Sequence, residues 1–277
     1  MRGRAPGLLL SAPAVFVLGL CFAWPMLRLL RISFYEGEGG ALEPAWSFAT
    51  YLRLAADPFV REVTWNALEL AAFAATVAVL LAYPMALFLF RTTSRFRGLL
   101  AIAAIAPLLV SGTARVIGWL ALLSDQGLVN QALMTLGIPP QRLINNWAGV
   151  RIGLTESVMP YAILALIAGL GRLDRRVEAA AASLGAGPLR TFWRITVPMT
   201  LPAISAAWLL AFVLGVSAFI TPKLMGGGRV FTLATEIFDA ALETLDWPAA
   251  AALSIYALVL LSLIVAAHAA LTRRAGA

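Results

Sequence analysis

The amino-acid sequence predicts an all-α membrane protein, and three observations lead to that fold class. First, 61% of the 277 residues are hydrophobic and only 13% are charged, whereas a soluble domain carries about 25% charged residues. Second, six apolar runs are long enough to cross a bilayer, because a span needs about 20 mostly apolar residues. Third, so little chain is left between these runs that no separate soluble domain fits.

The six predicted spans organise residues 1–277 as a single transmembrane domain. Their approximate bounds are 8–30, 64–90, 98–123, 150–171, 203–221 and 249–271. The first run follows Arg2 and Arg4 as in a secretory signal, but it is too long for one, and Leu20 before Cys21 is a poor cleavage site. We therefore expect a retained first helix.

The placement of charge predicts the orientation. Lys and Arg near span ends mark the cytoplasmic side of a membrane. If the N-terminus is inside, most flanking arginines fall in inner segments and most acidic residues in outer ones. Both termini and the segment 172–202 are then cytoplasmic. The net charge of +7 thus reflects topology, and no basic stripe with exposed aromatics indicates nucleic-acid binding.

The segment 172–202 is the longest inner loop, and its first half predicts a helix followed by a turn. Asp174 can cap the helix start, and Glu178 in the first turn faces the positive end of the helix dipole. Alanines 179 to 182 are strong helix formers. Gly185 and Gly187 can adopt the left-handed turn that ends the helix.

The second half of the loop predicts another helix. Pro188 suits its first position, and Pro198 and Pro202 are expected to end it before the fifth span. Its apolar residues at roughly helical spacing are Leu189, Phe192 and Ile195. With Phe192 and Trp193 as an aromatic knob beside basic residues, this helix–turn–helix fits a groove on a partner protein. An amphipathic helix lying on the membrane surface is the alternative.

This loop resembles the cytoplasmic motif of the inner-membrane permeases of bacterial ABC importers. That motif reads Glu-Ala-Ala, three residues, Gly, nine residues, Ile, any residue, Leu-Pro. The matching positions are Gly185, Ile195 and Pro198, with Val197 in place of Leu. One departure is that Ala179 stands where the motif glutamate is expected, and Glu178 lies one position earlier. A polar contact of that glutamate is then absent or supplied from Glu178.

The resemblance implies partners and a role for the loop. In the family it docks into a cytoplasmic ATPase subunit and couples ATP hydrolysis to opening of the pore. The residues expected to dock are Glu178, Ala179, Ala180, Gly185, Phe192, Ile195 and Pro198. The resemblance also implies a second homologous permease, an ATPase dimer that binds ATP and Mg, a binding protein outside the cell, and a multi-pass location in the bacterial inner membrane.

Further stretches resemble the spermidine/putrescine-type branch of this family. They are "AADPFV" at 55–60, "AYP" at 82–84, "PLLVSGTARVIGWLALL" at 107–123, "GLVN" at 127–130, "TPKLMGGG" at 221–228 and "DWPAAAALS" at 246–254. The resemblance implies import of polyamines or a related small solute. The branch also includes carriers for ferric iron, phosphonates and opine-like or amino-acid-like compounds, so the substrate stays open.

Other classes of function lack the residues that they need. A phosphate-binding loop requires Gly-Lys-Ser/Thr, but the only lysine is Lys223, between Pro222 and Leu224. With His268 and Cys21 each alone of its kind, we expect no catalytic residues, no metal site and no cofactor in this chain. A channel or secondary transporter is the alternative, but the halves show no convincing inverted similarity.

Three charged residues fall inside predicted spans, where a charge costs roughly 2.5–3.5 kcal/mol and usually faces an interior or a cavity. Glu69, Arg115 and Glu156 lie at similar depth in the outer half. In one interpretation Arg115 pairs with one or both acids and holds helices together. In the other, Glu156 or Glu69 lines the translocation path and attracts a cationic group.

The residues expected along that path are Glu156, Glu69, Arg115, Trp119 and Tyr161. Arg115 resembles a residue usual in the branch, whereas Glu156 stands where the branch often has an aromatic residue. Trp119 and Tyr161 could stack on a cation. Because Trp and Tyr are also enriched at membrane interfaces, a purely interfacial role is the alternative for both.

Overall fold

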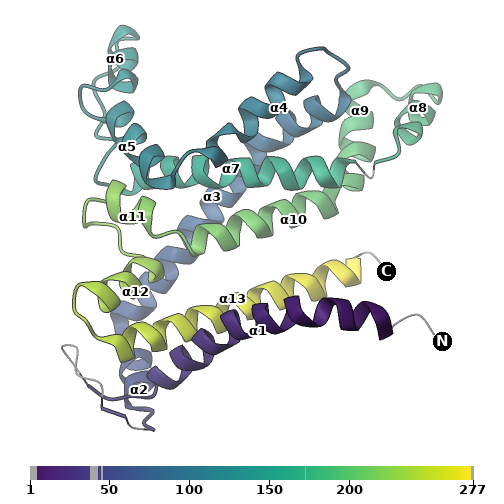
Figure 1. Cartoon of the computed structure of the whole chain (residues 1–277). Helices are drawn as coiled ribbons and strands as arrows, with labels where there is room; N and C mark the ends of the chain where they lie inside the picture. Colours follow the sequence, from purple (N-terminus) through teal and green to yellow (C-terminus); the bar gives the residue numbers. More distant parts are fainter. Residues whose placement is uncertain (1–4, 38–42, 45, 172, 276–277) are drawn as a thin grey trace. The chain divides into compact units, whose positions relative to one another are not determined.

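The computed structural model describes residues 5–37, 43–44, 46–171 and 173–275, and these residues form helices and connecting loops (Figure 1). Within the described ranges no strand is found, apart from one isolated bridge between Glu36 and Glu43. The all-α prediction is confirmed. The chain divides into two compact units, Met1–Arg61 with Glu236–Ser262, and Glu62–Thr235 with Leu263–Ala277.

The first unit contains the N-terminal helix and an aromatic cluster. Its helices are α1 (Ala5–Ile32), α2 (Ala49–Ala56), most of α12 (Leu233–Leu242) and the first half of α13 (Trp247–Ala275). The ring of Phe34 lies 5.2 Å from that of Phe48 and 5.4 Å from that of Tyr51. Arg53 forms an ion pair with Asp246 at 3.1 Å, which fixes α2 to the start of α13.

The second unit holds the polar residues discussed below. Its helices are most of α3 (Pro58–Arg91), α4 (Arg97–Ile105), η1 (Ala106–Leu109), α5 (Gly112–Leu123), α6 (Leu128–Thr135), α7 (Trp147–Leu170), α8 (Arg175–Ser183), α9 (Pro188–Thr191), η2 (Phe192–Thr196), α10 (Val197–Val216) and α11 (Ile220–Met225).

The core of the second unit is formed by small and branched residues of three helices. Ala82, Ala86 and Leu87 of α3 pack with Leu166 of α7 and Ala207 of α10. Small residues let helices approach closely in a membrane, where packing drives association. α7 and α10 accordingly run alongside each other (Figure 1).

The structure agrees with the predicted number of six spans to within one span. Among the residues that the structure describes, five helices are long and apolar enough to cross a membrane, and a sixth span is obtained if the bent pair Arg97–Leu109 and Gly112–Thr135 counts as one. The predicted span over 98–123 is not one continuous helix, because the two halves of that pair are bent by 102°. Pro107 has no backbone N–H, the chain tightens to a 3₁₀ turn there, and Val110 and Ser111 are extended.

The prediction that Pro198 and Pro202 end a helix before the fifth span is wrong. The helix continues from Pro188 to Val216, so the loop and the span share one helix. It accommodates Pro198 through a π-helical turn over Phe192–Thr196, in which the N–H of Val197 donates to the carbonyl of Phe192. Such a turn widens the helix where the proline ring would clash with the preceding turn. The span ends at Val216, earlier than the predicted 221.

Candidate functional site

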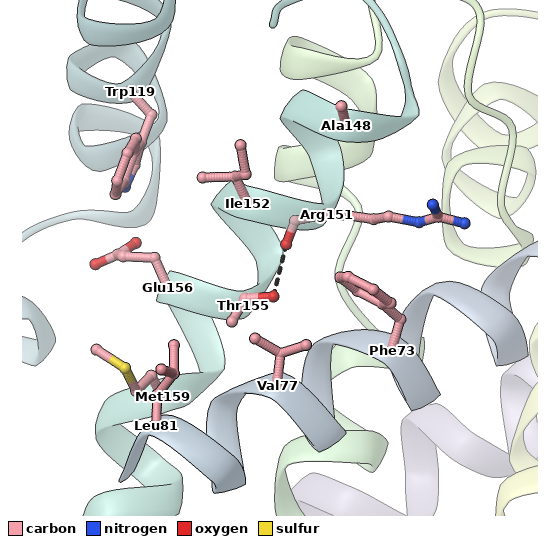
Figure 2. A pocket seen from close by; sticks show the side chains of 10 residues that line it. All are labelled: Phe73, Val77, Leu81, Trp119, Ala148, Arg151, Ile152, Thr155, Glu156 and Met159. Carbon is pink, nitrogen blue, oxygen red and sulfur yellow. Dashed lines mark hydrogen bonds between the residues drawn. The ribbon is translucent and has the colours of Figure 1, made fainter. Parts of the chain in front are cut away.

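A cavity of about 560 Å³ lies in the second unit between α3, α5 and α7 (Figure 2). Most of its walls are apolar, and two charged side chains reach it from α7. The lining residues are Phe73, Val77 and Leu81 of α3, Trp119 of α5, and Ala148, Arg151, Ile152, Thr155, Glu156 and Met159 of α7.

The cation of the cavity, Arg151, is already paired. Its Nη2 donates to Oε1 of Glu69, and its guanidinium lies over the ring of Phe73 at 5.0 Å and that of Trp147 at 6.0 Å. The sequence analysis did not include Arg151 among the candidate residues and considered only Arg115 as a partner of Glu69. The spacing of four residues between Trp147 and Arg151, which places the two side chains on one face of a helix, could have indicated a contact between them at the start of the fourth span.

The acid of the cavity, Glu156, is only loosely paired. Its Oε1 lies 3.8 Å from Nη1 of Arg115, which is too long for a hydrogen bond. Arg115 Nη1 instead donates to the carbonyl of Pro107 at 3.2 Å. The other carboxylate oxygen of Glu156, Oε2, is buried and has no hydrogen-bond partner among the described residues. The expected pairing of Arg115 with Glu156 is therefore present, but as a charge contact alone.

Arg115 faces a second, smaller cavity of about 250 Å³ in the same unit. That cavity is lined by Gly112, Arg115, Ser157, Ser217, Ala218, Phe219, Ile220 and Thr221. Glu156 lines the first cavity and Arg115 the second, so the loose ion pair joins residues of the two cavities. The hydroxyl groups of Ser157 and Ser217 make the surroundings of Arg115 partly polar.

The expected pathway residues are therefore brought together only in part. Trp119 and Glu156 line the larger cavity and lie on the same side of it, away from the guanidinium of Arg151 (Figure 2). Glu69 lies outside the lining and holds Arg151. Tyr161 lines neither cavity, and 39% of its surface is exposed.

The first helix and the turn of the segment 172–202 are formed as the sequence predicts. The side chain of Asp174 accepts a hydrogen bond from the backbone N–H of Arg176 at the start of α8. At its end, Gly185 has a positive φ of 82°. The N–H groups of Gly185 and Ala186 donate to the carbonyls of Ala182 and Ala181. These two hydrogen bonds are the Schellman pattern of a helix C-terminus.

The large side chains of this segment divide between an exposed face and the core. Leu184, Leu189 and Trp193 are 88%, 72% and 62% exposed. Together with the exposed Arg190 and Arg194 they form what we call the loop face. The two rings of the predicted aromatic knob stay in edge contact, with the centroids of Phe192 and Trp193 5.1 Å apart. Phe192 also packs against the core, with its ring centroid 6.2 Å from that of Tyr83.

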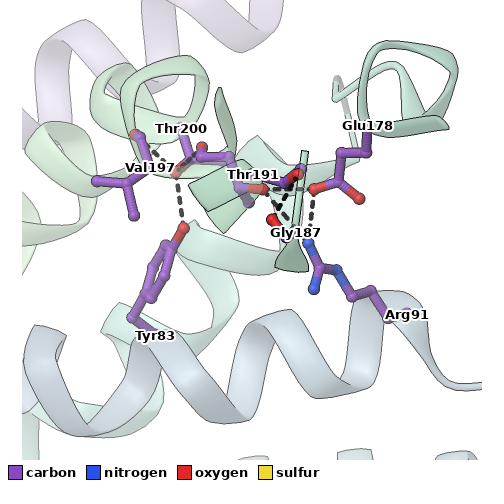
Figure 3. A network of polar contacts seen from close by, with 8 residues as sticks. Tyr83, Arg91, Glu178, Gly187, Thr191, Val197 and Thr200 are labelled. Atoms are coloured by element: carbon purple, nitrogen blue, oxygen red, sulfur yellow. Dashed lines mark hydrogen bonds and ion pairs between the residues drawn. The ribbon is translucent and has the colours of Figure 1, made fainter. Parts of the chain in front are cut away.

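The remaining residues expected to dock have different surroundings. Ala179, Ala180, Gly185 and Pro198 are exposed, and Ile195 is half-buried. Glu178 accepts two hydrogen bonds through Oε1, one from Nη2 of Arg91 and one of 2.6 Å from the hydroxyl of Thr196 (Figure 3). Glu178, which lies one position before the place of the motif glutamate, therefore makes polar contacts within the chain.

No group of three or more metal-ligating side chains occurs in the part of the chain that the structure describes. The second unit thus contains two candidate sites. One is the larger cavity, whose walls are mostly apolar and whose acid, Glu156, has an oxygen without a hydrogen-bond partner among the described residues. The other is the helical loop, which Glu178 connects to α3 through Arg91.

Comparison with known proteins identifies the family. The family described as "Binding-protein-dependent transport system inner membrane component" matches residues 78–276. The chain is 31% identical over 242 residues to the "Spermidine/putrescine transport system permease protein PotB" of Escherichia coli strain K12, covering 86% of this chain and 88% of that protein. It is 29% identical to the PotB protein of Haemophilus influenzae, with 89% of both chains covered.

A further relative is the "Putrescine transport system permease protein PotI" of Escherichia coli strain K12, which is 29% identical over 82% of this chain and 78% of that protein. Among solved structures, a chain of a bacterial ABC transporter involved in the import of the acidic polysaccharide alginate has the same fold. Its TM-score is 0.76 at 18% identity, covering 96% of this chain and 95% of that chain. The chain therefore belongs to the family of inner-membrane components of binding-protein-dependent transport systems, and it is a permease subunit of an ABC importer.

Proposed function

We propose that this permease imports polyamine-like cations, and that a carboxylate in its larger cavity contacts an ammonium group of the substrate on its way through the membrane. The names of the similar permeases motivate the choice of substrate. The observation that carries the proposal is the state of Glu156, whose Oε2 is buried at an apolar cavity without a hydrogen-bond partner among the described residues.

The chemistry of the cavity favours a cation with an apolar chain. An ammonium group beside Glu156 would form a charge-assisted hydrogen bond and lie close to the indole of Trp119, a good partner for cation–π contact. The apolar side chains of Val77, Leu81 and Met159 suit the methylene groups that separate the nitrogen atoms of a polyamine.

The choice of a cation over an anion such as a phosphonate rests on the names of the similar permeases and on Glu156. The nearby arginines are partly occupied, because Arg151 forms an ion pair with Glu69 and Arg115 donates to the carbonyl of Pro107. The Nε atoms of both arginines are nevertheless buried without a hydrogen-bond partner among the described residues.

The subunit works in an assembly with a second homologous permease, a cytoplasmic ATPase dimer that binds ATP and Mg, and a substrate-binding protein on the outer side. Both termini and the segment 172–202 lie in the cytoplasm, in keeping with the distribution of arginine. The loop face contacts the ATPase, because a contiguous exposed group of large apolar side chains beside cationic ones marks a protein-interaction surface. Gly185 sets the turn, and Phe192 supports the face from within.

Uptake by the assembled importer in proteoliposomes tests the substrate. The vesicles contain this chain, the second permease and the ATPase, with the binding protein outside and ATP inside. We expect ATP-dependent accumulation of labelled spermidine, competition by unlabelled putrescine, and no competition by a phosphonate. Accumulation of a phosphonate or of iron instead of spermidine would overturn the proposal for the substrate.

A further inference from the structure

The carboxylate of Glu178 is bound by residues of two other helices of the second unit. Its side chain is 20% exposed, and one oxygen, Oε1, binds both Arg91 at the end of α3 and Thr196 in the π-helical turn (Figure 3). Arg91 Nη2 also lies 3.4 Å from the hydroxyl of Thr196. These three residues, which we call the Glu178 cluster, therefore connect α8, α3 and the Pro188–Val216 helix at one point.

A second polar contact connects α3 to the same helix deeper in the unit. The hydroxyl groups of Tyr83 and Thr200 lie 2.9 Å apart. The hydroxyl of Thr200 also lies within hydrogen-bond distance of the carbonyls of Thr196 and Val197, and either hydroxyl can be the donor of the contact with Tyr83. Arg91 lies eight residues after Tyr83, or about 12 Å along α3. The two helices are thus held together at two levels.

The π-helical turn lies between the loop face and these contacts. It covers Phe192–Thr196 and is followed at once by Pro198, which has no N–H to donate to the preceding turn. Within described residues 188–216, the backbone hydrogen bonding therefore departs from the α-helical pattern just where the loop joins the span. Such π-helical turns occur frequently at functional sites. Within the Glu178 cluster, Thr196 belongs to this turn, and Glu178 and Arg91 contact it from two other helices.

The cluster also leads toward the larger cavity. α3, which carries Arg91, provides Phe73, Val77 and Leu81 to the cavity wall. A displacement of α8 therefore acts on a helix that lines the cavity, through a charge-assisted contact of the kind that is stronger and more directional than a neutral hydrogen bond.

We infer that Glu178 is an internal positioning residue that transmits movement of the cytoplasmic loop to α3, and that it is not a contact with the ATPase. This role differs from the one expected from the resemblance, which placed Glu178 among the docking residues. The inference rests on the proposed docking of the loop face to the ATPase, and it assigns docking and transmission to different residues of the same loop.

Three variants separate the two roles in the assembled importer. Glu178→Gln and Arg91→Gln each remove the ion pair from one side, and Arg91→Glu combined with Glu178→Arg restores it with the charges exchanged. Arg176→Gln on the same helix is the control, because Arg176 is exposed and lies outside the cluster. Co-purification of the ATPase measures docking, and substrate uptake per ATP hydrolysed in proteoliposomes measures transmission.

We expect both single variants to co-purify the ATPase at the wild-type level. Their uptake per ATP should fall about fivefold or more, the lower range of coupling between distant sites, and the exchanged pair should recover much of it. Thr196→Val should lower uptake per ATP as well, whereas Thr196→Ser, which keeps the hydroxyl, should not. Arg176→Gln should behave as wild type in both measurements.

The inference is overturned if Glu178→Gln loses the ATPase while Arg91→Gln retains it, because Glu178 would then contact the partner directly. Unchanged uptake per ATP in both single variants and in Thr196→Val would overturn it too. If the variant with the exchanged charges fails to reach the membrane, the inference is tested by the two variants of Thr196 instead: equal uptake per ATP in Thr196→Ser and Thr196→Val would contradict it. A wild-type chain that does not retain the ATPase would instead refute the docking proposal, together with the inference that depends on it.

Discussion

Replacing Glu156 by glutamine separates a structural role of this acid from a role in transport. The substitution removes the negative charge and keeps the shape of the side chain. In the structure Glu156 lies 3.8 Å from Arg115 without a hydrogen bond, and its Oε2 has no partner within the described part of the chain. We expect Glu156→Gln to lower uptake of a cationic substrate and to change the stability of the protein only slightly.

The magnitude follows from the geometry of the pair. Two unit charges 3.8 Å apart attract by about 4 kcal/mol at an effective dielectric constant of about 20, before desolvation is subtracted. Desolvation largely cancels such a gain, and Arg115 keeps its hydrogen bond to Pro107 after the acid is lost. The stability should therefore fall by no more than about 1 kcal/mol. A structural pair would cost roughly 3–5 kcal/mol when one partner is removed.

The effect on transport should be larger. A hydrogen bond to a charged group contributes roughly 1.5–3 kcal/mol, and about 1.4 kcal/mol corresponds to a factor of ten. If the carboxylate contacts the substrate in the rate-limiting step, Glu156→Gln should reduce spermidine uptake by about tenfold or more. Glu62→Gln serves as the control, because Glu62 is exposed and lines no described cavity.

The assay combines spermidine uptake in proteoliposomes with thermal unfolding of the purified assembly. It uses Glu156→Gln, Arg115→Gln, the double variant and the control. Full uptake by Glu156→Gln would refute the reasoning. A large loss of stability in Glu156→Gln that is restored in the double variant would refute it as well, because the acid would then serve only to neutralise Arg115.

Three further predictions concern topology, the loop and helix packing. In a variant without the native cysteine, a membrane-impermeant thiol reagent applied to intact cells should label Leu128→Cys and leave Arg190→Cys unlabelled; labelling at position 190 would contradict a cytoplasmic loop. Gly185→Val places a β-branched residue at φ 82°, which costs about 1–2 kcal/mol, so ATPase co-purification should fall while the membrane level is kept; unchanged co-purification would count against the predicted role of the turn. Gly169→Ala would place its Cβ only 2.2 Å from that of Ala203, so thermal unfolding should show a loss of about 1–3 kcal/mol that Ala203→Gly restores; no loss would show that α7 and α10 can separate at little cost.

The sequence predicted the helical class and the number of spans because both depend on the length and composition of apolar runs. Pro107 indicated an interrupted hydrogen bond within this span, but the sequence did not predict a bend of 102°, since hydropathy stays high across residues 98–123 while the backbone changes direction at Val110 and Ser111. It also assigned a helix end to Pro198, where the structure keeps the helix and changes its hydrogen bonding instead. A proline marks an interrupted hydrogen bond, but the surrounding packing decides whether the helix ends, bends or widens.

Site residues were predictable where the contact is local and unpredictable where it is not. The cap at Asp174 and the left-handed turn at Gly185 depend on neighbours in the chain, and both are confirmed. The partner of Glu178 is Arg91, which lies 87 residues away, and no periodicity in the sequence brings the two together. The spacing from Trp147 could have drawn attention to Arg151, but its ion pair with Glu69 was not predictable, because that contact depends on how α3 and α7 pack.

Two ion pairs of α3 lie far apart along the helix, one at Glu69 and one at Arg91. Glu69 and Arg91 are separated by 22 residues of one helix, or about 33 Å, which is close to the thickness of the hydrocarbon core. Pro84 interrupts the helix between them, next to the residue that binds Thr200. A helix with this interruption can bend at one place without losing further hydrogen bonds. If Glu178 transmits movement of the loop as inferred, a displacement at Arg91 would first tilt the segment after Pro84, and the hydrogen bond between Tyr83 and Thr200 would oppose the spread of that tilt to the part of α3 that lines the cavity.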